Sequence, residues 1–441
     1  MSPSLYADHL RTVLARYEAA LARSGFDQAV VHSGIPKVAF QDDYHYAFKP
    51  NPNFLQLLPL DRHPGCFVSI AAGKKPQLIF LQPFDYWHVV PEDPSGDWVA
   101  HFDITIIRTP AEAKSVLKLT GKAAFIGEDS SHVEDWGFAA FNPQTLLAPL
   151  HWQRGMKTAW EVENIAAANR IGARAHNAAR DAFLAGESEL GIHYAYLRAS
   201  GLKESELPYG NIIALNEHGA VLHYTELQTQ KPAQSRSFLI DAGANVNGYA
   251  SDITRTYARD KNEFAELIAA LDVHQLKLID AVRPGQSYVD LHIAFHRAIG
   301  GLLKQFGVIT IDGDSAVEQG ITSTFFPHGI GHLLGIQVHD IAGRVADDTG
   351  TPNPPPAAHP YLRLTRKIEK DMVFTVEPGI YFIDMLLKEL KAKPQAAHVN
   401  WAKVEAFKPF GGVRIEDNVL VTDGKPRNLT REAFVGEQPQ G

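Results

Sequence analysis

The sequence predicts an α/β (α+β) protein of two domains, an N-terminal α/β domain over residues 1–155 and a C-terminal domain over residues 156–441. Three observations support this prediction. Short apolar strands alternate with helical stretches in the first part. The pattern changes near residue 155, where a long alanine-rich helix begins. Helices followed by acidic strands occur twice in the second part, which indicates a duplicated unit folded about one site.

Composition narrows the class of protein before any motif is considered. Hydrophobic residues at 45% and charged residues at 21% are typical of a globular protein. A net charge of −8 argues against a nucleic-acid partner. We expect no membrane partner, because we find neither a signal peptide nor an apolar run that could cross a bilayer. The single cysteine, Cys66, excludes an intrachain disulfide, and together these features predict a cytoplasmic location.

The N-terminal domain reads as a helix followed by short strands. Apolar residues near helical spacing predict a helix over residues 4–26. Strands are expected at residues 29–33, 66–72, 76–82, 103–108 and 123–126. Between them, the aromatic and polar segment 40–54 reads as a loop. We find no catalytic motif in this half.

The C-terminal domain has longer helices and strands that carry acidic residues. Helices are expected over residues 157–183, 188–200, 263–282 and 288–306. Strands are expected over residues 211–214, 372–382 and 411–422, with a hairpin at 237–257. A proline-rich loop at 351–360 and a polar insertion at 384–401 complete the domain.

The central feature of this domain is the predicted hairpin. Asn247-Gly248 is a strong signal for a two-residue turn, since both central residues need positive φ. Asp241 then faces Thr254, and Asp252 lies on the same face as Asp241. Two such carboxylates can share a pair of cations. The alternative is that both aspartates are solvated on an exposed face.

The second half supplies two more carboxylates. Glu377 ends an apolar strand and precedes Pro378. Arg414 and Glu416 are two residues apart, so they share one face of their strand. The alternative for Glu416 is a structural salt bridge with Arg414.

Three histidines, His328, His332 and His339, lie in one glycine-rich run. Gly329 stands where a zinc-protease helix would need glutamate, and the glycines argue against a regular helix. We therefore expect a loop that enters a strand. Two aspartates, two glutamates and one histidine form a mostly oxygen shell, which suits Mn²⁺ and tolerates Co²⁺ or Zn²⁺.

These motifs resemble the "pita-bread" metallopeptidases, a family that includes methionine aminopeptidase, aminopeptidase P and prolidase. The resemblance rests on residues 241–257, 327–340, 375–382 and 411–418 and covers essentially the whole chain. It is greatest to the bacterial Xaa-Pro dipeptidases, including those known as organophosphorus acid anhydrolases. The resemblance implies a creatinase/prolidase-like N-terminal domain and a pita-bread catalytic domain built from a duplicated αββ unit.

The resemblance also implies a role for each residue of the site. Two divalent ions per subunit would be held by Asp241, Asp252, His332, Glu377 and Glu416. Asp252 and Glu416 would bridge the two ions, and Glu377 would be the general base beside a bridging hydroxide.

Further residues are implied around the substrate. His339 and His223 would flank the scissile carbonyl, and Arg363 would bind the free carboxylate after proline. A surface ion pair is the alternative for Arg363. The expected substrate contacts also include Arg414, His328, Tyr209 and Tyr288. In a homodimer, the N-terminal domain would close the partner's site through Asp43.

The substrate implied is an Xaa-Pro dipeptide. Three alternatives stay open: aminopeptidase P activity on longer peptides, organophosphate hydrolysis as a side or main activity, and a creatinase-like or non-enzymatic protein without metal. Occupation of all five ligand positions favours a metal enzyme.

Overall fold

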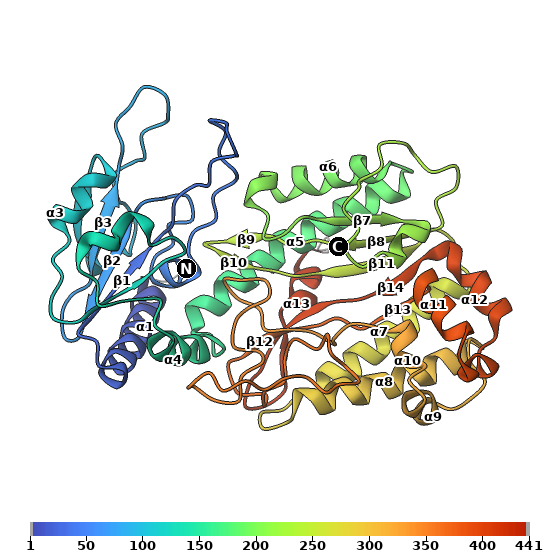
Figure 1. Ribbon diagram of the computed structural model, residues 1–441. Coiled ribbons are helices and arrows are strands. Elements are labelled where there is room, and N and C mark those ends of the chain that lie inside the picture. Colours follow the sequence, from blue (N-terminus) through green and yellow to red (C-terminus); the bar gives the residue numbers. More distant parts are fainter. Residues whose placement is uncertain (1–2, 438–441) are drawn as a thin grey trace. The chain divides into compact units, whose positions relative to one another are not determined.

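A computed structural model describes residues 3–437 of the chain (Figure 1). It divides into two compact units. The first comprises the residues up to Glu163 together with Asp347–Thr351. The second comprises Asn164–Ala346 and the chain from Pro352 onward. None of the described helices is long and apolar enough to cross a bilayer.

The first unit is built on one six-stranded mixed sheet with the order β4-β3-β2-β1-β5-β6. β1 pairs antiparallel with β2 and parallel with β5. The strands are β1 Gln28–His32, β2 Phe67–Ala71, β3 Gln77–Leu81, β4 Asp103–Ile107, β5 Ala123–Ile126 and β6 Ala140–Phe141. The helices are α1 Pro3–Ser24, α2 Pro52–Leu57, α3 Ala113–Val116 and α4 Gln144–Arg154. The five predicted strands are confirmed, and the two-residue β6 was too short to predict.

The expected loop at residues 40–54 is wrong at its end, where α2 begins at Pro52. The Asn51 side chain accepts a hydrogen bond from the Asn53 amide, and proline occupies the first helical turn. Both features favour a helix start. The remainder of the segment is irregular and presents Phe40, Tyr44 and Tyr46 to solvent.

The second unit contains two three-stranded antiparallel sheets, β11-β8-β7 and β12-β15-β16, and two short ribbons, β10-β9 and β13-β14. Its strands are β7 Ile212–Leu215, β8 Ser237–Asp241, β9 Asn245–Val246, β10 Tyr249–Ala250, β11 Thr254–Ala258, β12 Val373–Val376, β13 Gly379–Tyr381, β14 Gly412–Arg414, β15 Asp417–Leu420 and β16 Arg427–Asn428. The matching pair of sheets confirms the expected duplicated unit.

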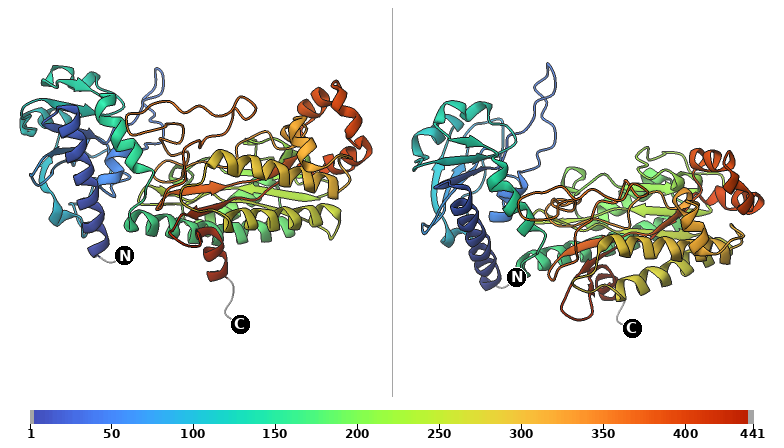
Figure 2. Two further views of the ribbon diagram at one scale, coloured as in Figure 1. Left: turned by 90° about the horizontal axis from the view of Figure 1, so that it is seen from below. Right: turned by 60° about the horizontal axis from the view of Figure 1, so that its bottom comes forward.

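Long helices border these strands (Figures 1 and 2). α6 packs against β7, α7 packs against β11, and α7 and α8 pack against each other. The long helices are α5 Ala159–Leu184, α6 Glu189–Ser200, α7 Glu263–Asp280 and α8 Tyr288–Gln305. The shorter ones are α9 Gly313–Glu318, α10 Thr322–Phe325, α11 Asp384–Lys391, α12 Trp401–Phe407 and α13 Leu429–Gly436. The expected polar insertion thus contains α11, which buries Leu387 and Leu390.

The central hairpin is confirmed in its register. β8 pairs with β11 so that Asp241 lies opposite Thr254. Asn247 and Gly248 have φ values of 52° and 87°. These are the positive angles that the two-residue turn requires.

The predicted continuous strands at residues 372–382 and 411–422 are wrong, because each is broken in the middle. β12 pairs with β15, whereas β13 pairs with β14. Pro378 lacks a backbone donor and so cannot continue the ladder. The breaks leave Glu377 and Glu416 between strands, at the point where the two pairs diverge.

Candidate active site

The structure brings the four predicted carboxylates and one histidine together in the second unit. Asp241 ends β8 and Asp252 lies two residues before β11. Glu416 forms an isolated bridge with Thr254, which joins the two halves of the unit. Ligand atoms of Asp252, His332 and Glu416 all lie within 4.8 Å of one another. Strands from both halves therefore converge on one acidic site.

His332 faces this site through Nε2. This atom lies 3.3 Å from Asp252 Oδ2 and 3.7 Å from Glu377 Oε1. The other ring nitrogen, Nδ1, lies 3.0 Å from the Leu333 carbonyl oxygen, which can only accept a hydrogen bond. Nδ1 therefore carries a proton, and Nε2 is the nitrogen that faces the carboxylates and is placed to bind a metal ion.

The histidine run is a loop, as predicted, but it does not lead directly into a strand; among the described residues the run forms only an isolated bridge, Leu333 to Phe374. The run instead lies along β12, with the Thr375 amide donating to the His332 carbonyl. A Cβ atom at Gly331 would lie 2.0 Å from the Thr375 carbonyl oxygen. Glycine at this position therefore lets the histidine loop approach the ligand strand.

Arg414 does not pair with Glu416, so that alternative is wrong. Arg414 Nη2 donates to Asp241 Oδ2 at 2.8 Å, across to the other half of the unit. Nη1 donates to the Tyr381 hydroxyl at 3.0 Å. Glu416 Oε2 accepts instead from Thr254 Oγ1 at 2.7 Å. The shared strand face was correct, but the ion pair forms between sheets, which spacing along one strand cannot reveal.

The carboxylates of the site lie close together and are shielded from water, an arrangement that favours bound cations. Burial, together with the charges of Asp252, Glu377 and Asp241, raises the pKa of Glu416 well above its usual range. Burial raises the pKa of Glu377 to about 7. Glu416 Oε1 is buried without a hydrogen-bond partner among the described residues. A buried acceptor without a partner costs about 1–3 kcal/mol, so these residues fit a site for positive ions.

Asp252 and His332 shift each other's pKa within this site. Burial favours the protonated Asp252 carboxyl, but hydrogen bonding from His332 and its charge hold the pKa below the usual value. Burial opposes the His332 charge, but Asp252 and Glu377 together raise the pKa of His332. Such mutual stabilisation shows that positive charge is favoured between these ligands.

Two of the expected substrate contacts, Tyr209 and Tyr288, lie close to the proposed ligands. The Tyr209 hydroxyl lies 2.9 Å from Asp241 Oδ1 and 2.5 Å from Asp252 Oδ1. Tyr288 is fully buried, and its hydroxyl donates to the Thr375 carbonyl at 2.9 Å. Tyr288 therefore supports β12 beside the site, and its contact with substrate stays a prediction.

The remaining histidines and Arg363 surround His332. The His339 and His332 ring centroids are 4.4 Å apart at 86°. Burial, followed by the charges of His332 and Arg363, lowers the pKa of His339 to about 4. The charge of His223 also contributes to this effect, so His223 and Arg363 both lie near His339. Both side chains are exposed.

His328 is connected to the ligands through a tyrosine. Its Nε2 lies 2.8 Å from the Tyr381 hydroxyl, which also accepts from Arg414. His328 Nδ1 is 3.6 Å from Glu377 Oε2. Asp43 belongs to the first unit, where it is exposed on the aromatic loop.

Sequence reasoning missed several supporting residues. Thr254, Thr375 and Asn418 form hydrogen bonds with the ligands Glu416, His332 and Asp252, respectively. Tyr381 accepts a hydrogen bond from Arg414, which in turn pairs with Asp241. Thr254 could have been found, because the predicted register places it opposite Asp241. The others act across separate strands and leave no local signal.

Comparison with known proteins gives a consistent result. The family model for the Xaa-Pro dipeptidase N-terminal domain matches residues 4–152, and that for metallopeptidase family M24 matches residues 163–423. An Xaa-Pro dipeptidase of Xanthomonas euvesicatoria pv. vesicatoria is 53% identical over 98% of both chains. One from Stenotrophomonas maltophilia is 52% identical over 98% of this chain and 97% of its own.

Solved structures resemble the chain in fold. Aminopeptidase PepP of Pseudomonas aeruginosa matches with a TM-score of 0.74 and 22% identity, over 99% of this chain and 98% of its own. Zinc-substituted aminopeptidase P of E. coli, in complex with product, matches with a TM-score of 0.72 and 20% identity over the whole of both chains. At this identity the likeness establishes the shared fold.

Proposed function

The chain belongs to metallopeptidase family M24, a family of metal-dependent hydrolases, and we propose that it is an Xaa-Pro dipeptidase that hydrolyses the peptide bond before a C-terminal proline. One observation carries the proposal. A cluster of four carboxylates and a histidine, of which Asp252, His332 and Glu416 are buried, lies in a chain that is 52–54% identical to Xaa-Pro dipeptidases over nearly its whole length.

Five residues would hold two divalent ions: Asp241, Asp252, His332, Glu377 and Glu416. Their support is the convergence of these side chains and the unpaired Glu416 Oε1. Mn²⁺ is the proposed metal, since four of the five ligands are carboxylates and only one is an imidazole. When bound, such a pair of ions polarises the scissile carbonyl and lowers the pKa of a water molecule.

Side chains of the protein would then transfer the proton and stabilise the carbonyl oxygen of the substrate. Glu377 would accept a proton from the attacking water at a carboxylate oxygen and deliver it to the departing proline nitrogen. His339 and His223 would donate to the carbonyl oxygen as negative charge develops on it. Support for this assignment is the contact of the His339 ring with His332.

Arg363 would read the free carboxylate that follows proline. Its planar guanidinium can make two charge-assisted hydrogen bonds to a carboxylate. It is exposed and close enough to His339 to lower its pKa. Arg414, in contrast, is committed to Asp241 and Tyr381, so we assign it to positioning these residues.

We propose a homodimer in which the N-terminal domain, residues 1–155, closes the partner's site through Asp43. The support is the segment around Asp43, where Phe40 is 89% exposed and Tyr44 60%. Exposed aromatic groups of this kind often mark an interface. Asp43→Ala should raise KM for dipeptides at unchanged metal content. Unchanged KM and kcat in this variant would count against the assignment.

We also propose a cytoplasmic location. Cys66 is buried and free, which agrees with a reducing compartment. Detection of the protein outside the cytoplasmic fraction of fractionated cells would contradict this.

The decisive experiment compares Xaa-Pro dipeptides with Xaa-Pro-Xaa tripeptides after loading with Mn²⁺. A dipeptidase should cleave the dipeptides with the higher kcat/KM. Faster cleavage of tripeptides would instead establish aminopeptidase P activity, which the solved structures' shared fold permits. A phosphotriester assayed alongside would establish whether organophosphate hydrolysis is a side activity or the main one.

A further inference from the structure

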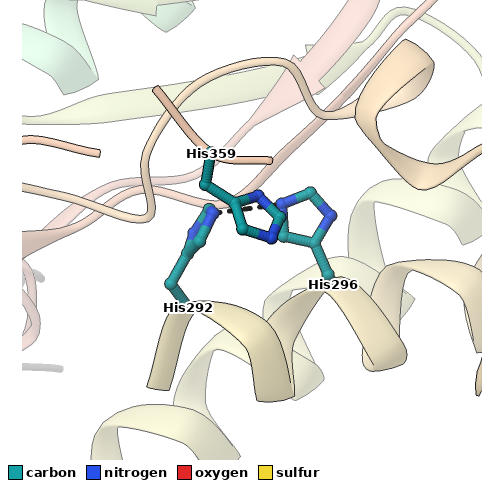
Figure 3. A group of neighbouring side chains, drawn as sticks. All are labelled: His292, His296 and His359. Atoms are coloured by element: carbon teal, nitrogen blue, oxygen red, sulfur yellow. Dashed lines mark hydrogen bonds between the residues drawn. The ribbon is translucent and has the colours of Figure 1, made fainter. Parts of the chain in front are cut away.

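A second group of potential metal ligands lies in the second unit, outside the acidic site. His292 and His296 project from the same face of α8, and His359 approaches them from the proline-rich segment (Figure 3). Possible ligand nitrogens of the three residues all lie within 4.8 Å of one another. This His292–His296–His359 group has imidazole ligands only, unlike the acidic site.

The spacing of the two helix histidines fits a tetrahedral ion. Their Nε2 atoms are 3.2 Å apart. Two nitrogens bound tetrahedrally at 2.0–2.1 Å from zinc are about 3.3 Å apart. His296 Nδ1 lies 3.0 Å from Thr322 Oγ1, which can accept its proton and leave the Nε2 lone pair toward the group.

Burial keeps these rings in the form that binds metal. His292 and His296 are each 1% exposed, and His359 is partly exposed. Burial, together with the neighbouring histidines, lowers the pKa of His292 to about 2 and that of His296 to about 3. His292 Nδ1 is buried with no hydrogen-bond partner among the described residues. His359 offers the side from which an ion can enter.

The group is close to the acidic site but separate from it. The Phe326 ring lies between them, with its centroid 4.9 Å from that of His296 and 4.8 Å from that of His328. The alternative interpretation is that His292 and His296 are structural core histidines that share one hydrogen bond. That interpretation explains the contact between His292 and His296, but it does not explain the convergence of a third imidazole from another segment.

We propose that His292, His296 and His359 form an additional metal site that binds Zn²⁺. Three imidazoles and no carboxylate select zinc over Mn²⁺, and three protein ligands leave the fourth position for water. The ion ties the segment at residues 352–360 to α8. His359 lies four residues before Arg363, so zinc binding restricts the chain next to the proposed carboxylate-binding residue.

Zinc binding by the full chain, stripped of metal and dialysed against buffered Zn²⁺, tests the proposal. The variant is His359→Ala, whose side chain is partly exposed and on a loop, so folding should be preserved. His274→Ala, on α7, is the matched control, since His274 is partly buried and belongs to neither ligand group. We expect about three zinc ions per chain for wild type and control, and about two for His359→Ala.

Two further measurements make the result specific. Loading with Co²⁺ should give the strong visible absorption of a four-coordinate ion, and His359→Ala should lose it. Hydrogen exchange at the backbone amides of residues 353 and 357–359, the non-proline positions of the segment, should slow on zinc addition in wild type and not in the variant. Equal zinc content in wild type and His359→Ala overturns the site. A lower zinc content without the difference in exchange overturns the restriction of the segment. Neither readout depends on which peptide the enzyme cleaves.

Discussion

Removing the Glu377 charge should stabilise the chain when metal is absent. Glu377 is a largely buried carboxyl whose pKa rises from 4.5 to about 7, chiefly because of burial, with Asp252 and Asp241 nearby. Glu377→Gln replaces it with a neutral side chain of nearly the same shape. The metal-free variant should therefore be more stable than metal-free wild type at pH 8, although the same change removes a ligand from the metal-loaded enzyme.

The magnitude follows from the linkage between protonation and folding. Between pH 4.5 and about 7 the unfolded chain loses the Glu377 proton while the folded chain keeps it. Because the unfolded state then binds fewer protons, stability falls as pH rises through this window and stays lowered above it. Each pKa unit corresponds to about 1.4 kcal/mol, so the cost at pH 8 is about 3 kcal/mol. Glutamine avoids this cost at every pH.

Urea denaturation followed by circular dichroism, in the presence of a chelator, measures the effect from pH 4.5 to pH 8. The free energy of unfolding of wild type and Glu377→Gln should agree at pH 4.5 and diverge by about 3 kcal/mol at pH 8. Glu318→Gln, at an exposed glutamate of α9, is the control and should follow wild type. Parallel curves for wild type and Glu377→Gln would refute the reasoning, and metal loading should reverse their order at pH 8.

The remaining predictions concern activity. Asp252→Asn and Glu416→Ala should each lose metal, measured by atomic emission, and nearly all turnover; a metal-loaded, fully active variant would contradict the ligand assignment. His339→Ala should keep its metal and lose much of kcat, whereas a loss of bound metal would make His339 a ligand. Arg363→Ala should lower kcat/KM for Xaa-Pro by roughly 30-fold or more, because one partner of a charged pair is worth roughly 2–5 kcal/mol. Metal content and phosphotriester hydrolysis should change little in Arg363→Ala. Unchanged selectivity of this variant for dipeptides over tripeptides would exclude Arg363 as the residue that binds the free carboxylate.

The sequence was informative where structure is determined locally. The hairpin register followed from one turn signal, since Asn247-Gly248 fixes which residues face each other on either side. α6 begins after Ser188, whose side chain caps the Gly191 amide, so the helix start was also readable. In both cases, the residues that determine the geometry lie within a few positions of one another.

The sequence was less informative where two strands change partners. An apolar run through residues 372–382 looks continuous, because period-two patterning does not show which strand pairs with each part. The break at Pro378 arises because the two parts of the run pair with different strands: β12 pairs with β15, and β13 pairs with β14. This choice of partners is set by the tertiary structure. The histidine loop also lacks a strand pattern, yet it lies along β12 because Gly331 permits close approach.

Arg414 affects the net charge of the whole site as well as that of its ion-pair partner, Asp241. Arg414 is buried beside Asp241, and Asp252, Glu377 and Glu416 lie within the same network of interacting charges. Four ionised carboxylates and one guanidinium leave three negative charges, and buried charge is tolerated only when it is compensated. One divalent ion would leave the site negative. Two would leave one positive charge, which favours an anionic ligand. The arginine thus reduces the charge by one without occupying the centre of the site, and the remaining negative charge favours the binding of divalent cations there.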